Sequence, residues 1–182
     1  MTAFIKQVTN DHGYVFSSYA EMHNWSITCP EEFWLAVIKF TGIKFSKPCD
    51  HVLINANSMP DAKWFSGAKL NFARHLLHYN NDKPAIIFHN ESGERITLTY
   101  RELNQQVRRL AYRFQLLGIQ QGDRIAGYLP NRPETIVAML ATTSIGAIWS
   151  SCSSDFGYHG VLDRLLQISP KILIGCESEN SY

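Results

Sequence analysis

Short apolar runs that alternate with helical segments after residue 124 constrain the fold most. The apolar runs are 124–129, 147–149 and 171–174, and they are separated by segments with helical periodicity, 133–144 and 158–168. Short strands separated by helices of about a dozen residues are typical of parallel strands joined by right-handed crossovers. The pattern therefore predicts an α/β fold with a β-α-β-α-β parallel sheet that helices cover.

The residues just before this sheet predict a short helix and a hairpin. One helical face is expected from four apolar residues at helical spacing, Leu70, Ala73, Leu76 and Leu77. Apolar runs at 85–88 and 96–98 then flank the letters HNESGERIT, in which Gly93 suits a turn. We expect two antiparallel strands there.

A long helix is expected to follow the hairpin. Thr99 and Glu102 match the capping box, in which a hydroxyl and a carboxylate each satisfy a free backbone N–H. Gly118 is expected to end this helix. Its buried stripe is predicted to consist of Leu103, Val107, Leu110, Ala111, Phe114 and Leu117.

Residues 1–66 carry weaker periodicity and are expected to form an amino-terminal extension. One short helix is predicted from Pro30 to Gly42, with glutamates in its first turn. Its apolar face is expected to contain Phe33, Trp34, Val37 and Ile38. Residues 43–63 predict a loop that wraps over the next domain and carries a short apolar insert, 52–54. The second domain is expected to span 67–182.

Charge and cysteine content exclude several classes of protein. The 182 residues carry a formal net charge of +1, so no long-range field would attract nucleic acid or an anionic membrane. The four cysteines lack Cys-x-x-Cys spacing, and the first residues lack the pattern of a signal peptide. We expect free thiols, a cytoplasmic location and no membrane span.

The letters SSCSSDFG, directly after the predicted strand 147–149, mark a candidate ligand site. Ligands of open parallel sheets bind beyond the carboxyl ends of the strands, and small hydroxyl side chains leave room and offer donors. The letters LPNRP follow the preceding strand, where Asn131 can turn the chain and Pro133 can begin a helix. The two strand ends are expected to form one wall of a cleft. Capping and turn formation by the serines is the alternative interpretation.

Individual side chains near this site favour structural roles. Cys152 lacks a base adjacent in sequence and is expected to be a buried or half-buried thiol. His159 is expected in the first turn of a helix, and Trp149 in the core. The chain lacks Gly-x-Gly-x-x-Gly, Gly-x4-Gly-Lys-Ser/Thr and Gly-x-Ser-x-Gly, and no metal-ligand spacing is found. Residue patterns alone indicate part of an α/β ligand-binding domain.

Longer stretches resemble a known family. The segments WFSGAKLNFARHLL, LTYRELNQQVRRLAYRFQLLGIQQGDRIAGYLPNRPETIVAMLATTSIGAIWSSCSSDFG and VLDRLLQISPKILI are similar to the amino-terminal part of acyl-CoA synthetases of the adenylate-forming superfamily. The letters GYLPN and IWSSCS-DFG resemble most closely the acetoacetyl branch of that family. The resemblance runs from about residue 33 to residue 174.

The resemblance implies a two-step ligation. ATP and a short carboxylate such as acetoacetate would give an acyl-adenylate and pyrophosphate, and CoA thiolate would then displace AMP. ATP, CoA and Mg²⁺ are implied for the complete enzyme, with small molecules as its partners and neither nucleic acid nor a membrane. The family's phosphate loop and catalytic lysine are expected beyond residue 182, so no catalytic or metal-binding residue is assigned. This chain alone is expected to be inactive, to bind none of these ligands tightly and to be able to self-associate.

The resemblance also implies candidate CoA contacts. Residues 151–157 correspond to a Gly-rich loop near CoA in acetyl-CoA synthetases, so Ser154, Asp155, Phe156 and Gly157 are expected to line the CoA side of the cleft. Asp155 stands about where those relatives have glycine, and Ser154 where proline is expected. The letters GCESENSY offer no arginine for the CoA 3′-phosphate. A free-standing binding or interaction module without catalysis is the alternative function.

Overall fold

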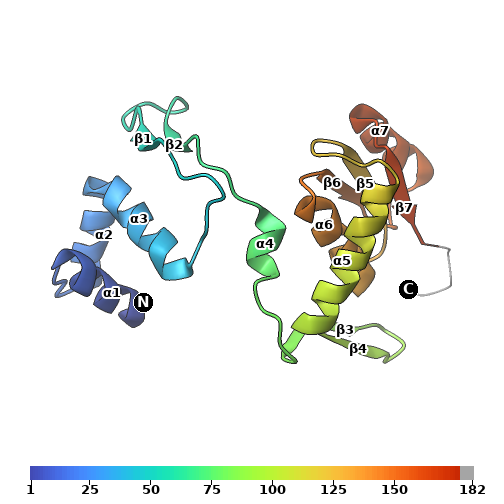
Figure 1. The fold of residues 1–182 in the computed structure, drawn as a ribbon, viewed down its shortest axis with the longest axis horizontal. Helices are drawn as coiled ribbons and strands as arrows, with labels where there is room; N and C mark the ends of the chain where they lie inside the picture. The colour runs from blue at the N-terminus through green and yellow to red at the C-terminus, as the bar shows by residue number, and fades with distance from the viewer. Residues whose placement is uncertain (177–182) are drawn as a thin grey trace. The chain divides into compact units, whose positions relative to one another are not determined.

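The computed structural model describes residues 1–176, which form two compact units (Figure 1). The first unit is Met1–Leu70, and the second contains the described residues from Asn71 onward. Each unit has a hydrophobic core of its own. The two units are therefore described separately.

Three helices form most of the first unit: α1 (Thr2–His12), α2 (Tyr19–Thr28) and α3 (Pro30–Thr41). The prediction of a single helix before residue 66 was wrong, because α1 and α2 were missed. Helix α1 has neither a side-chain N-cap nor an acidic residue in its first turn, and neither helix has the initial proline from which α3 was predicted. Local capping compensates in α2, where the N-cap Ser18 hydroxyl accepts a hydrogen bond from the Glu21 N–H at 3.3 Å.

The core of the first unit is centred on Trp25, whose ring packs edge-on to Phe33 with centroids 5.7 Å apart. The predicted helix α3 is confirmed, and Phe33 and Val37 pack against this core as expected. Trp34 does not, because 43% of it is exposed, and Ala36 is buried instead. The buried residues of this core are Phe4, Val8, Met22, Trp25 and Ala36.

The segment 43–63 is not a loop throughout. Strand β1 (His51–Ile54) includes the predicted apolar insert and pairs in antiparallel register with β2 (Lys63–Ser66). Leu53 lies opposite Trp64 in this ladder. Backbone pairing thus organises a segment whose side chains show no sustained period.

The second unit begins with α4 (Phe72–Leu76), followed by the hairpin of β3 (Pro84–His89) and β4 (Arg95–Thr99). The predicted hairpin is confirmed, with Gly93 at φ +83° in its turn. The face predicted for α4 was half right: Ala73 is buried and Leu77 packs against the core, whereas Leu70 and Leu76 are exposed.

Helix α5 (Tyr100–Leu116) begins with the predicted capping box. The Glu102 N–H donates to the Thr99 hydroxyl at 3.2 Å, and the Thr99 N–H donates to the Glu102 carboxylate at 2.8 Å. The predicted stripe packs inward except for Leu117, which follows the last helical residue and is 71% exposed.

The remaining elements form the predicted parallel sheet, with β5 in the middle of the order β6-β5-β7. The predicted fold class is confirmed, and both helices have the predicted bounds. The elements are β5 (Arg124–Tyr128), α6 (Pro133–Ser144), β6 (Ile148–Cys152), α7 (Tyr158–Ile168) and β7 (Ile172–Gly175).

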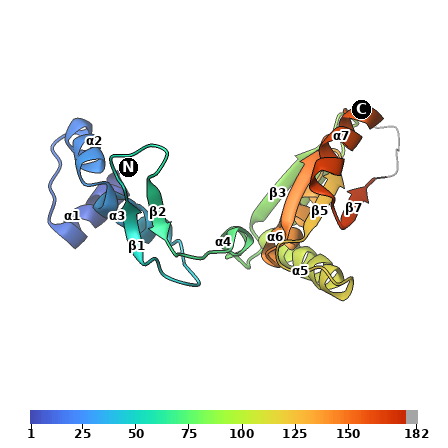
Figure 2. The same cartoon turned by 90° about the horizontal axis from the view of Figure 1, so that it is seen from above.

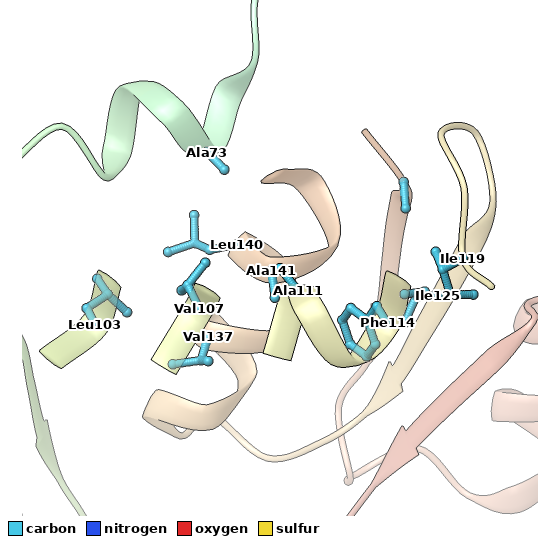
Figure 3. Packing of buried hydrophobic residues seen from close by; sticks show 11 residues of the cluster. Ala73, Leu103, Val107, Ala111, Phe114, Ile119, Ile125, Val137, Leu140 and Ala141 are labelled. Atoms are coloured by element: carbon cyan, nitrogen blue, oxygen red, sulfur yellow. The ribbon is translucent and has the colours of Figure 1, made fainter. Parts of the chain in front are cut away.

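Helices cover both faces of this sheet (Figure 2). Ile125 of β5 contributes to the core shared with α5 and α6, shown in Figure 3. The next residue, Ala126, faces the opposite cluster with Val161 and Leu165 of α7. Alternation along β5 therefore buries both of its faces, as expected of a central strand in a doubly wound sheet.

Candidate functional site

The carboxyl ends of β5 and β6 lie side by side, as the sequence predicted. Gly127 pairs with Ser151, and Tyr128 pairs with Cys152. The loop after β5 turns at the exposed Asn131, and Pro133 occupies the first turn of α6. The predicted adjacency of the two strand ends is confirmed, and the cleft that they were expected to wall stays a prediction.

The hydroxyl cluster is divided differently from the prediction. Strand β6 was expected to end at Trp149, but Ser150, Ser151 and Cys152 continue it. Ladder pairing with all of β5 extends the strand past its apolar residues. Two of the four serines therefore belong to the sheet, and the loop itself begins at Ser153.

The turn that remains, residues 153–157, uses its polar groups internally. The Ser153 hydroxyl donates to the Asp155 carboxylate at 2.8 Å and accepts from the Asp155 N–H at 3.3 Å. The Phe156 N–H donates to the Ser153 carbonyl at 3.2 Å. These bonds give Ser153 the turn-forming role that the alternative interpretation anticipated.

Sequence reasoning missed Tyr128, which braces this turn. Its hydroxyl lies 3.0 Å from each of the carbonyl oxygens of Ser154 and Phe156, and these two acceptors share its single proton. Tyr128 follows three apolar residues of β5, and no local sequence signal links it to a turn that lies 26 to 28 residues further along the chain. Tyr128 thus ties the end of β5 to the turn after β6.

Arg164 was also missed as a residue of this region. Its guanidinium carbon lies 4.3 Å from the centre of the Phe156 ring, and its Nη1 donates to the Gly160 carbonyl at 2.7 Å. Phe156 remains 42% exposed. The guanidinium of Arg164, just past the middle of α7, is therefore held beside the turn by stacking on an aromatic face.

The four predicted site residues are gathered on one turn at the sheet edge. Ser154 is half-buried, whereas Asp155, Phe156 and Gly157 are exposed. A Cβ at Gly157 would meet no atom within 4 Å, so the turn has open space there. Cys176 is exposed, and the letters ESENSY, in which no arginine was found for CoA, lie outside the described residues.

A cavity of about 430 Å³ opens elsewhere on the same sheet edge, between the ends of β5 and β7. Crossovers from β5 and to β7 run over opposite faces of the sheet, and such switch points are where doubly wound folds bind ligands. Arg132 and Glu134 lie at its rim, their side chains 3.4 Å apart. Apolar lining comes from Leu110, Phe114, Leu129, Val137, Ala138 and Ile174.

The other side chains singled out in the sequence have structural roles. Cys152 is buried, with 6% exposed, and contributes to the core beneath α7, so the predicted buried thiol is confirmed. His159 lies exposed in the first turn of α7, and Trp149 packs against the main core, both as predicted. Within residues 1–176 no group of His, Cys, Asp or Glu side chains could hold a metal ion.

No helix in the described part of the chain combines the length and the apolar character that a bilayer span requires. A parallel sheet with helices on both faces defines the second unit as part of a doubly wound α/β domain, a class of fold whose ligands bind at the carboxyl ends of the strands.

Comparison with known proteins then identifies the family. The chain belongs to the family of AMP-binding enzymes, whose model matches residues 72–181. A second model, described as the acetyl-coenzyme A synthetase N-terminus, matches residues 19–76. Together the two models cover both structural units in part.

Similar proteins share nearly the whole chain. An acetoacetyl-CoA synthetase of Xenopus tropicalis is 43% identical over 181 residues, which are 98% of this chain and 27% of that protein. A malonamoyl-CoA synthetase of Penicillium aethiopicum is 41% identical over 180 residues, 95% of this chain and 25% of that protein. The chain thus spans about a quarter of the length of the curated relatives it matches.

A solved structure extends this similarity to the fold. The acetoacetyl-CoA synthetase from Streptomyces lividans matches with a TM-score of 0.88 and 40% sequence identity. The match covers 96% of this chain and 27% of that one. Sequence and fold therefore resemble the same class of enzyme.

Proposed function

We propose that this chain is the amino-terminal part of an ATP-dependent acid–thiol ligase acting on acetoacetate. The complete reaction would join acetoacetate and CoA while ATP is cleaved to AMP and pyrophosphate. The observation that carries the proposal is the similarity to acetoacetyl-CoA synthetases in both sequence and fold over nearly the whole chain. The AMP-binding family supports adenylate formation as the first step.

The choice of acid substrate is the part of this proposal that the sequence identities support least. A relative named for malonamate is nearly as similar as the acetoacetate enzymes, at 41% compared with 43% identity. The two acids differ in a terminal amide in place of a methyl ketone. Malonamate is therefore the second candidate substrate.

The residues of this chain would serve the CoA half of the reaction. The turn 154–157 would line the CoA side of the cleft, and Tyr128 would keep its backbone in place through a hydroxyl proton that the carbonyl oxygens of Ser154 and Phe156 share. Arg164 would offer positive charge to a CoA phosphate, while Asp155 would repel it. No described residue is assigned to Mg²⁺, because the donor sets needed for a metal are not assembled there. ATP chemistry would be carried by the remaining three quarters of such an enzyme.

A chimera tests the proposed activity. The chain would replace the matching amino-terminal quarter of the Streptomyces lividans enzyme, and thioester formation would be measured with acetoacetate and with malonamate. We expect CoA- and ATP-dependent turnover with a higher kcat/KM for acetoacetate. If the folded chimera prefers malonamate, malonamate replaces acetoacetate as the proposed substrate. A folded chimera that ligates neither acid would refute the proposal.

The isolated chain tests the assignment of the turn. Titration with CoA should shift the amide signals of residues 151–157, and ATP with Mg²⁺ should leave them unchanged. We expect a dissociation constant on the order of a millimolar, because half of a cleft desolvates a ligand poorly. Asp155→Gly should strengthen the response by removing a negative charge, whereas Asp163→Gly on α7 is the matched control. If several millimolar CoA leaves the amide signals of residues 151–157 unchanged in every variant, the assignment of this turn to CoA is contradicted.

The isolated chain should also fail to catalyse exchange of pyrophosphate into ATP. Exchange that depends on acetoacetate and exceeds a heat-inactivated control would show that the chain is active by itself.

A further inference from the structure

The outward face of helix α5 carries exposed arginines together with exposed apolar side chains. Its inner stripe is buried in the core of the second unit, and α5 lies on the outside of that unit (Figures 1 and 2). Two apolar side chains on its outer side are largely exposed, Tyr112 at 61% and Leu116 at 59%. Three exposed arginines accompany them: Arg108, Arg109 and Arg113.

These five residues form a regular surface, called here the α5 face. Arg108, Tyr112 and Leu116 follow one another at intervals of four, so they lie in one row along the helix. Arg109 and Arg113 form a second row beside the first. Tyr112 and Leu116 thus have one guanidinium group at the start of their row and two along one side of it.

The three arginines lack counter-charges. Among the described residues, no carboxylate lies within ion-pair distance of any of them, although nearby arginines are paired. Arg101 of the same helix binds Asp82 at 2.8 Å, and Arg132 lies 3.4 Å from Glu134. Residues 103–117 contain no aspartate or glutamate at all. A solvated helix face of ordinary type mixes both signs, and this one does not.

We propose that the α5 face docks on an anionic lipid surface. Arginines would contact the headgroup phosphates, while Tyr112 and Leu116 would enter the interfacial layer between them. An acidic peptide fits less well, because the 430 Å³ cavity beside α5 is lined by its inner residues Gln106, Leu110 and Phe114 rather than by the α5 face. The expectation of no membrane partner rested on a net charge of +1. A net charge summed over the whole chain does not reveal a local cluster of three arginines.

The expected strength is modest and depends on salt. Each arginine near an anionic surface strengthens binding roughly fivefold, so three give on the order of a hundredfold over a neutral surface at low salt. Screening shortens this attraction to about 10 Å at 0.1 M salt. Reversible association with the bilayer surface is therefore expected.

Vesicle co-sedimentation tests the proposal with the full chain. Vesicles of phosphatidylcholine with about a third phosphatidylserine should bind it, and pure phosphatidylcholine vesicles should not. Replacing Arg108, Arg109 and Arg113 by glutamine should abolish binding, because glutamine keeps helix propensity while removing charge. The control replaces Lys6, Lys63 and Arg95, which are exposed elsewhere, by glutamine. It changes net charge equally and should bind like the unmodified chain.

Two outcomes would overturn the proposal. One is equal loss of binding in both triple variants, which would indicate a response to net charge alone. The other is binding that persists after Tyr112→Ser and Leu116→Ser and is competed away by polyglutamate, which would favour an acidic protein partner. Far-ultraviolet circular dichroism on each variant verifies that α5 remains folded.

Discussion

At the scale of single residues, Gly127 of β5 leaves no room for a side chain, because any Cβ there would collide with Trp149. A Cβ there would lie 2.6 Å from Cη2 and 2.7 Å from Cζ2 of the indole. Gly127→Ala should therefore lower the free energy of unfolding by about 1–3 kcal/mol, the usual cost of overpacking a core. Urea unfolding measures the change.

Two variants make this measurement specific. Gly175→Ala on β7 meets no atom within 4 Å and should change stability by less than about 0.5 kcal/mol. Trp149→Phe removes the indole atoms that a Cβ at Gly127 would meet. In the Trp149→Phe background, Gly127→Ala should therefore lower the free energy of unfolding by less. An equal cost in both backgrounds would show that the indole is not the cause.

Asp123 offers a test based on charge. Lys171 lies 2.7 Å from its carboxylate, and the Gln120 N–H donates to it at 2.8 Å. These hydrogen bonds, that of Lys171 foremost, lower the pKa of Asp123 below its ordinary value. Because the folded pKa is the lower one, Asp123 stabilises the fold above the unfolded pKa, and this contribution is lost as pH falls through the folded pKa.

Lys171→Met should raise the pKa of Asp123 toward its ordinary value of about 4. Carboxyl carbon chemical shifts followed against pH measure it directly. Lys63→Met, far along the chain on β2, is the control and should leave the titration unchanged. A pKa that stays low in Lys171→Met would assign the shift to the Gln120 backbone.

At the residue scale, sequence patterns located the candidate turn but not its supports. Ser154 to Gly157 could be placed after a strand because apolar runs and small polar residues are local signals. Tyr128 and Arg164 could not, since their contacts with the turn join residues 26 to 28 and eight positions apart. Which side chains meet there depends on pairing and helix packing.

At the scale of elements, predictability followed the strength of local signals. Helices α5 and α6 carry a capping box or an initial proline together with apolar residues that pack inward, and their positions were predicted. Helices α1 and α2 lack an initial proline, α1 also lacks a side-chain N-cap, and both were missed. Strand β6 was predicted too short, because cross-strand pairing rather than apolar content extends it.

The capping box of α5 gives an element-scale prediction. Thr99→Ala removes the hydroxyl that accepts from the Glu102 N–H, so the free energy of unfolding should fall by about 1 kcal/mol. Thr99→Ser keeps that acceptor and should retain most of the stability. Denaturant unfolding compares the three proteins. Equal stabilities of the serine and alanine variants would contradict a capping role.

At the scale of the whole molecule, the alternation of strands and helices predicted the class of fold but not the strand order. Order β6-β5-β7 places the switch point between β5 and β7, where the 430 Å³ cavity opens, whereas the sequence directed attention to β5 and β6. Local periodicity carries no information about which strand a later strand will join. The cavity was therefore beyond prediction from the sequence.

The same strand order predicts self-association of this chain. Within the described sheet, β6 and β7 are the outer strands, and each exposes a large side chain, Ile148 at 52% and Leu173 at 58%. Unpaired backbone groups beside exposed apolar side chains favour edge-to-edge pairing between copies. Light scattering across a concentration series should show a rising average mass.

A lysine on the edge strand should suppress that association, because charged side chains disfavour pairing at sheet edges. Leu173→Lys is therefore expected to keep the mass close to that of a monomer at concentrations where the unmodified chain associates. Val15→Lys makes the same chemical change at a loop residue that is 80% exposed, and it should associate like the unmodified chain. If Val15→Lys and Leu173→Lys lower the mass equally, net charge rather than the β7 edge controls association, and a chain that is monomeric throughout would refute edge pairing altogether.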